Sequence, residues 1–159
     1  MALAKEAMTG GGSKLSVSAA LPATWNKTGF EALTWTQIGN LVNLGELGKT
    51  YNTTNFEPVS NPEIEPLPTN YSMGTPAVTY AYPREAGYDD GQAIMDAAVD
   101  SQDYHSFKVE MQNGTVKYFK ARVSSNSLML GGVSDIQMVT ANLQIYTADQ
   151  GFVTVAPTP

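Results

Sequence analysis

The sequence predicts a mainly β protein with one α-helix. Short runs of alternating apolar and polar residues recur along the chain between glycine and proline residues, which is typical of strands joined by turns. An Asn113-Gly114 pair lies between two such runs and is a strong hairpin signal. One segment, 89–103, instead has apolar residues at helical spacing. We therefore expect a β-rich domain with a helix lying on one sheet.

Residues 104–125 predict a long two-stranded ribbon that reverses at Asn113-Gly114. Both turn residues tolerate the positive φ angles of a type I′ turn. With a two-residue loop, Glu110 faces Lys117 and Met111 faces Val116, so acid meets base and apolar meets apolar. We expect this register in the folded protein.

The second strand of the ribbon has two conflicting phases. Val116 and Tyr118 lie on one face, whereas Phe119, Ala121 and Val123 lie on the other. Either a β-bulge lies near Phe119, or both faces of the strand are covered at different points. The second arrangement suits a sheet that packs on its own helix and on a neighbouring subunit.

Further strands are expected on both sides of the ribbon. The candidates are 14–20, 33–38, 41–47, 50–56, 77–82 and 136–147. The last of these has Val139, Ala141, Leu143 and Ile145 on one face. Its other face is polar but weakly charged, as expected of a lumen or a wet interface.

The chain divides into three parts. Residues 1–13 form a short arm made flexible by three consecutive glycines, residues 14–156 form a single domain, and residues 157–159 form a tail. A long loop is expected at about 48–70, because four prolines between residues 57 and 69 cannot donate to a sheet. This loop is either an arm that reaches a partner or simply mobile.

The helix is expected to begin at Asp89 or Asp90, with Gln92 placed as in a capping box. Its packing stripe is made of small and branched apolar residues. The stripe comprises Ala93, Ile94, Ala97 and Ala98. Because this face is narrow, the helix should lie close to one sheet.

Composition excludes several classes of function. Nine basic and fifteen acidic residues give a net charge of −6, which disfavours binding to a phosphate backbone. The chain has no cysteine, so disulfides and thiolate metal sites are excluded. It has no apolar run long enough for a membrane span and no signal peptide, so we expect synthesis in a cytoplasm.

Catalytic patterns are also lacking. His105 is the only histidine, and without cysteine or a G-x-S-x-G motif the usual triads cannot be assembled. The aspartates between 89 and 103 are explained by a solvated helix face, since no calcium-binding loop is present. We expect no enzyme activity, no cofactor and no metal.

The hairpin also carries a resemblance to a known family. The matching residues are Asn113, Gly114, Thr115, Val116, Phe119, Val123, Ser124 and Ser125. This pattern resembles the hairpin of the major tail tube proteins of lambda-like siphophages, and the likeness covers roughly residues 89–146. The order of loop, helix, hairpin and closing strand is similar too.

This resemblance implies a structural protein of the virion tail, made in the host bacterial cytoplasm. It implies a β-sandwich or barrel-like tail tube fold whose inner sheet joins neighbouring subunits into a β-barrel ring. Hexameric rings would then stack into a tube through which DNA passes during ejection, without specific binding. The implied partners are other copies of the chain and the tape measure, tail terminator and tail-tip proteins.

Contacts between subunits and rings are assigned to the loop and the arm. The loop residues are Tyr51, Phe56, Pro58, Ile64, Pro66 and Leu67, and the arm residues are Leu3, Lys5 and Met8. Glu110 and Asp135 are candidate lumen acids that would repel DNA over about 8 to 10 Å in physiological salt. Equally, such acids could simply keep the monomer soluble.

Two classes of function remain open. One is a self-assembling tube protein of a long-tailed phage or of a related contractile or secretion apparatus. The other is a non-enzymatic β-sandwich binding module, such as a virion decoration or carbohydrate-binding domain. The loop at 48–70 distinguishes them, since it should contact another subunit in a tube and border a ligand site in a binding module.

Overall fold

The computed structural model describes residues 7–84 and 89–157 and confirms a mainly β chain. The strands are β1 (Lys14–Ser18), β2 (Thr36–Gln37), β3 (Leu41–Asn43), β4 (Thr50–Phe56), β5 (Glu65–Ser72), β6 (Ala77–Ala81), β7 (Tyr104–Glu110), β8 (Val116–Met129), β9 (Met138–Ile145) and β10 (Val153–Val155). The helices are α1 (Lys27–Glu31) and α2 (Asp90–Ser101). The expectation of one helix is therefore wrong, because the short helix α1 was not predicted.

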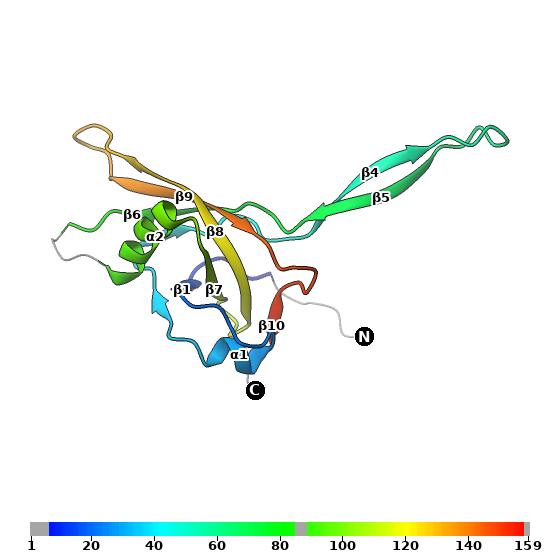
Figure 1. Ribbon diagram of the computed structural model, residues 1–159. Coiled ribbons are helices and arrows are strands. Elements are labelled where there is room, and N and C mark those ends of the chain that lie inside the picture. The colour runs from blue at the N-terminus through cyan, green and yellow to red at the C-terminus, as the bar shows by residue number, and fades with distance from the viewer. Residues whose placement is uncertain (1–6, 85–88, 158–159) are drawn as a thin grey trace.

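Eight strands form one antiparallel sheet in the order β2-β1-β7-β8-β9-β6-β3, with β10 paired to β8 (Figure 1). The 14-residue strand β8 belongs to both halves of this sheet. Its first half pairs with β7 and β10, and its second half pairs with β9. We call the second half of β8 (residues 124–129), β9, β6 and β3 the distal sheet.

The core lies on one face of the eight-stranded sheet and is closed by α2. Its largest fully buried side chains include Tyr80, Phe107, Phe119 and Met95. Val139, Ala141, Leu143 and Ile145 are buried on the core face of β9, which confirms the predicted alternation of that strand.

Helix α2 begins as the sequence predicts but packs through a different face. The Asp89 side chain accepts the N–H of Gln92, which confirms an aspartate cap. The Gln92 amide donates to the carbonyls of Gly39 and Ala81 at 3.0 and 3.1 Å, so it joins the helix to the β2–β3 connection and to the end of β6 instead of completing a capping box. Because this amide is buried, the face of α2 that packs on the domain includes Gln92 and differs from the predicted alanine face.

The predicted packing stripe is therefore corrected. Ala93 and Ala97 are exposed, Ile94 is half-buried against the core, and Ala98 is buried. The buried face consists of Gly91, Gln92, Met95 and Ala98. Gly91 permits this approach, because a Cβ there would lie 2.5 Å from the Gln37 carbonyl oxygen.

The hairpin between β7 and β8 forms, but its predicted register and turn type are wrong. Met111 N–H donates to Thr115 O at 2.8 Å, and Gly114 N–H donates to Met111 O at 3.0 Å. Gly114 has a φ of +88°, whereas Asn113 is not among the non-glycine residues of the described chain with positive φ. The loop thus has three residues with a left-handed glycine last, the second most common hairpin arrangement.

The extra loop residue shifts every cross-strand pair by one position. Glu110 faces Val116 and Val109 faces Lys117, so the predicted acid–base pair does not form. Glu110 instead forms an ion pair with Lys108 at 3.3 Å, two residues earlier on the same face of β7. Charge matching across the strands therefore did not select the register.

Both faces of β8 are covered near its start, which resolves its conflicting phases. Phe119 stacks on Phe107 in the core at a centroid distance of 5.6 Å, and Tyr118 stacks on Phe30 on the opposite face at 5.0 Å. The cover on that face belongs to α1 of the same chain. The bulge in β8 lies between Val123 and Ser125, so the alternative of a bulge near Phe119 is wrong.

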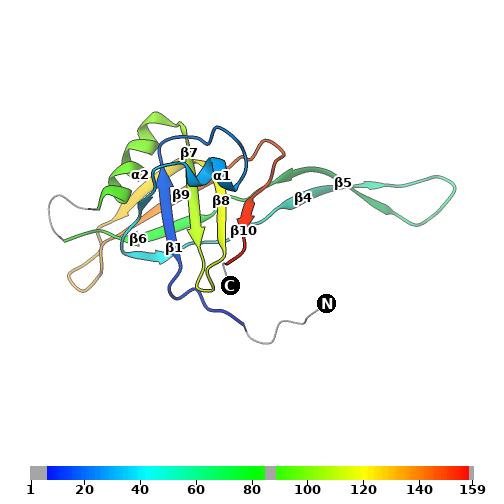
Figure 2. The same cartoon turned by 90° about the horizontal axis from the view of Figure 1, so that it is seen from below.

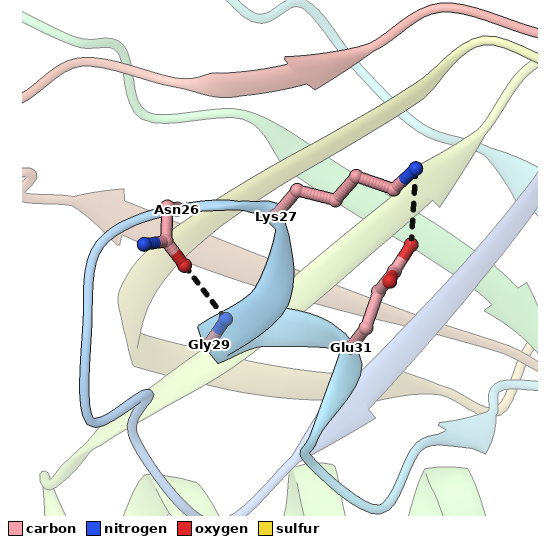
Figure 3. A network of polar contacts seen from close by, with 4 residues as sticks. All are labelled: Asn26, Lys27, Gly29 and Glu31. Carbon is pink, nitrogen blue, oxygen red and sulfur yellow. Dashed lines mark hydrogen bonds and ion pairs between the residues drawn. The ribbon is translucent and has the colours of Figure 1, made fainter.

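Helix α1 is a single turn fixed by local polar contacts (Figure 3). The Asn26 side chain accepts the N–H of Gly29 at 2.8 Å, and Lys27 forms an ion pair with Glu31 at 3.9 Å. A helix of five residues is too short to show apolar residues at helical spacing in the sequence. Its cap, Asn26, was the one available sequence signal.

Strands β4 and β5 form a separate two-stranded sheet that projects away from the domain (Figures 1 and 2). We call residues 50–72 the projecting ribbon. The expectation of an irregular loop up to Thr69 is wrong, because β5 begins at Glu65 and pairs with β4. Pro66 and Pro68 are two residues apart, so their backbone nitrogens point to the same edge of β5. That edge is the outer edge of a two-stranded ribbon, where no N–H donor is needed, so both prolines are tolerated.

Candidate functional site

The projecting ribbon exposes apolar and acidic side chains together. Of the predicted contact residues, Tyr51, Phe56, Ile64, Leu67 and Pro66 are exposed and Pro58 is half-buried. Its acidic residues, Glu57, Glu63 and Glu65, lie in or next to the turn between β4 and β5, and residues 50–83 contain no lysine or arginine. This turn is the end of the ribbon farthest from the domain (Figure 2). A surface of this kind is suited to contact with another protein.

The base of the ribbon is fixed to the domain by a polar cluster. The Tyr71 hydroxyl donates to Asp149 in the β9–β10 loop. Lys49 Nζ lies 3.9 Å from the ring centroid of Tyr71 and 4.9 Å from that of Tyr51. Asp149 has a φ of +68°, a left-handed conformation uncommon outside glycine. This cluster sets the direction in which the ribbon leaves the domain.

The hydrogen bond to Asp149 raises the pKa of Tyr71 above its ordinary value. A raised folded pKa means that the contact stabilises the fold below the ordinary tyrosine pKa of about 10 and is lost as pH rises through the folded value. In Tyr71→Phe the ribbon-base amides should exchange faster at neutral pH. In the wild type this protection should disappear only at alkaline pH, as measured by hydrogen exchange.

Tyr51→Phe is the matched control, since it removes a neighbouring hydroxyl and leaves the Asp149 contact in place. Ultraviolet difference titration gives the second measurement. A Tyr71 that titrates at the ordinary tyrosine pKa would contradict the hydrogen bond to Asp149.

The distal sheet has two open edges within the described residues. Strand β7 begins at Tyr104, opposite Arg122, so residues 124–129 of β8 pair only with β9. The Gln102 side chain donates to Val123 O at 3.0 Å and closes the edge just before this point. At the other side of the distal sheet, β3 pairs only with β6, and Val42 there is exposed. Open strand edges are templates for pairing with another chain.

The face of the distal sheet that points away from α2 is uncharged on β6, β8 and β9. Its residues form three cross-strand rows: Ala77, Asn142 and Ser125; Thr79, Thr140 and Ser127; Ala81, Met138 and Met129. Hydroxyl, amide and small apolar groups thus make up this surface. It is the polar, weakly charged face expected for β9.

The two candidate lumen acids are not brought together. Glu110 lies at the end of β7 in its ion pair with Lys108. Asp135 lies in the β8–β9 loop, where its side chain accepts the N–H of Gly132 at 2.8 Å. Glu110 pairs with the first residue of β8 and Asp135 follows its last residue, so the two lie near opposite ends of β8, and neither lies on the cross-strand rows. Each acid has a local partner that accounts for it.

Of the arm residues, Leu3 and Lys5 lie outside the described residues, and Met8 is exposed. The glycines that follow share a groove with β3. Residues 10–13 and 41–45 line a groove of about 530 Å³. The start of the domain is thus close to one open edge of the distal sheet.

The one histidine of the sequence has a structural contact in the fold. His105 is buried, with Nδ1 at 3.0 Å from the carbonyl of Asp103. No cluster of three metal-ligating side chains occurs among the described residues. No described helix has the length and apolarity needed to cross a membrane.

Solved structures with the same architecture decide the fold. The SPP1 tail tube superposes with a TM-score of 0.63 at 14% identity, covering 96% of this chain and 81% of that one. The chain has a phage tail tube fold. A chain of the anti-feeding prophage (AFP) baseplate gives a TM-score of 0.65 at 10% identity, with complete coverage of both chains. A chain of the PVC contractile injection system, from a structure of its sheath/tube terminator, gives 0.64 at 10% identity, covering 97% and 100%.

Sequence comparison adds no closer relative. No family model matches the chain, and no curated protein matches it either. The tail tube fold is therefore visible in the structure and in the hairpin resemblance rather than in overall sequence identity. The predicted resemblance is confirmed at the level of the fold.

Proposed function

We propose that this chain is the structural subunit of a tail tube, in which rings of subunits stack into a conduit. The observation that carries the proposal is the distal sheet with two open edges in a tail tube fold. A closed ring removes both edges, which is the general means by which β-barrels avoid uncontrolled pairing.

The direction of the strands supports ring closure. The order β8-β9-β6-β3 is antiparallel at each step, so its two edge strands run in opposite directions. A rotation about a ring axis keeps strand directions unchanged. β3 of one copy therefore meets β8 of the next in an antiparallel sense, and the alternation continues around the ring.

We propose a hexameric ring. The AFP baseplate chain with this fold comes from a six-fold symmetrised assembly, which supports that number. The proposed partners beyond the chain itself are the tape measure, tail terminator and tail-tip proteins of a phage tail. The assembled location is the virion tail, after synthesis in the host cytoplasm.

The uncharged rows of the distal sheet are the proposed lumen wall. Core residues and α2 occupy the other face, so this face is the one left free. The three rows themselves contain no lysine or arginine and give DNA few contacts to bind, which suits passage during ejection. The next row along the same face, Arg122 opposite Gln144, lies outside this wall. This wall replaces the hypothesis of lumen repulsion by Glu110 and Asp135, since neither acid belongs to it.

Stacking is assigned to the projecting ribbon and the N-terminal arm. The ribbon carries exposed apolar groups well beyond the domain that supports it, where only another molecule can cover them. We propose that it reaches the adjacent ring. The arm, whose glycines lie beside β3, would contact the neighbour near the ring edge.

Negative-stain electron microscopy of the purified protein over a concentration series tests the proposal, together with mass spectrometry of tails from the virion that encodes it. Hollow tubes with stacked rings, or this chain as the dominant tail component, are expected. Discrete particles at every concentration, with the chain absent from tails, would favour the binding module instead.

A further inference from the structure

Two cations and two tyrosines gather on the face of β7 and β8 that points away from the core. Arg122 Cζ lies 4.5 Å from the ring centroid of Tyr104. Lys120 Nζ lies 5.0 Å from the Tyr104 centroid and 5.3 Å from that of Tyr146 in the segment after β9. We call Tyr104, Lys120, Arg122 and Tyr146 the cation cluster. The rings hold both cations in place.

The charge of this cluster is not balanced within the described residues. The ion pairs among the described residues are Lys27–Glu31 and Lys108–Glu110. No described carboxylate therefore lies within ion-pair distance of Lys120 or Arg122. Arg122 Nε is buried without a hydrogen-bond acceptor. In a chain of net charge −6, these two neighbouring cations leave unbalanced positive charge that is complementary to a carboxylate.

The projecting ribbon carries the complementary chemistry. Glu57, Glu63 and Glu65 are exposed, and no basic residue lies between positions 50 and 83. Phe56 and Ile64 beside them are half exposed, at 51% and 50%. The ribbon extends away from its own domain in both views, so its acidic end can reach a cation cluster only on another copy (Figures 1 and 2).

We infer that the cation cluster is the docking site for the acidic end of the projecting ribbon of a second copy. Ribbon glutamates pair with Lys120 and Arg122, and Tyr146, which is 54% exposed, covers part of the apolar surface beside them. This inference rests on the proposed tube, because it names the surface that receives the ribbon.

Charge reversal in both partners tests the inference. Lys120→Glu with Arg122→Glu should raise the concentration needed for tube formation at least about tenfold, and so should Glu57→Lys with Glu63→Lys and Glu65→Lys. A chain that combines all five changes should regain assembly, since each pair is restored with opposite sign. The ribbon changes are at exposed positions, so that variant keeps the fold even if Arg122→Glu does not.

Lys14→Glu with Lys27→Glu is the control, because it makes the same change in net charge as the cluster variant at two exposed positions outside the cluster. It should assemble as the wild type does. Normal tubes from both reversed variants, with wild-type tubes also present, would overturn the inference and leave the tube intact. A third outcome would assign the cluster to phosphate contacts instead. In that case the ribbon reversal would leave the tubes unchanged, and the cluster reversal would form tubes that DNA cannot pass. A wild type that never forms tubes, with the chain also absent from virion tails, would instead contradict the proposed function.

Discussion

Replacing Asn52–Asn70 with an Asn-Gly turn should abolish tube formation while leaving the domain folded. Tyr51 and Tyr71 are directly opposite each other in the ladder, so a two-residue turn can join them. The contacts of Lys49 and Asp149 at the ribbon base remain. Because the removed residues other than Pro58 are exposed, the free energy of unfolding should change by less than about 1 kcal/mol.

Thermal melting and electron microscopy on the same sample separate folding from assembly. The shortened chain retains both open edges of the distal sheet, so it should still join the end of a wild-type tube and stop its growth. Substoichiometric inhibition of wild-type assembly is the expected result. Tubes of normal length from the shortened chain alone would contradict a bridging role for the ribbon.

Strands with a clear period of two could be read from the sequence. β1, β6 and β9 form where alternation predicts them, since the apolar face of each lies in a common core. In β1 the other face is buried as well, at Ser16 and Ser18. The aspartate cap of α2 was equally readable, because the cap acts on the neighbouring backbone alone. These features depend on local chemistry, which a sequence states directly.

Features fixed by tertiary contacts were not readable. The hairpin register depends on a three-residue loop with Gly114 left-handed, although charge pairing favoured the alternative. The packing face of α2 depends on two carbonyls, at Gly39 and Ala81, that receive the Gln92 amide. Strand β5 was hidden by its prolines, because only the structure shows that the edge carrying them is free.

The assembly surfaces were partly readable. The ribbon was expected as a projecting segment from its prolines, and its exposed apolar residues follow from the same stretch. The cation cluster was not found, because Tyr104, Lys120 and Tyr146 come from three separate segments. Lys120 and Arg122 at alternate positions of one strand were the available signal, with Tyr104 in the paired strand β7 and Tyr146 just after β9.

Leu128→Pro should prevent ring closure without unfolding the subunit. Tyr146 N–H donates to Lys120 O, so the backbone groups of even-numbered residues in this part of β8 point to β9. The bulge between Val123 and Ser125 shifts the alternation by one, and Ser125 and Ser127 then point to β9. Leu128 N–H therefore points to the open edge, where a proline removes a donor that only a neighbouring copy uses.

Two controls isolate this donor. Leu128→Ala removes the exposed side chain and keeps the N–H, so it should still form rings. Ser127→Pro removes a donor on the β9 side, so it should lower the melting temperature of the monomer, whereas Leu128→Pro should change its free energy of unfolding by less than about 1 kcal/mol. Rings of normal diameter from Leu128→Pro would show that this edge of β8 does not pair with a neighbour. Their absence, with an intact monomer, would place the subunit contact on the backbone of β8.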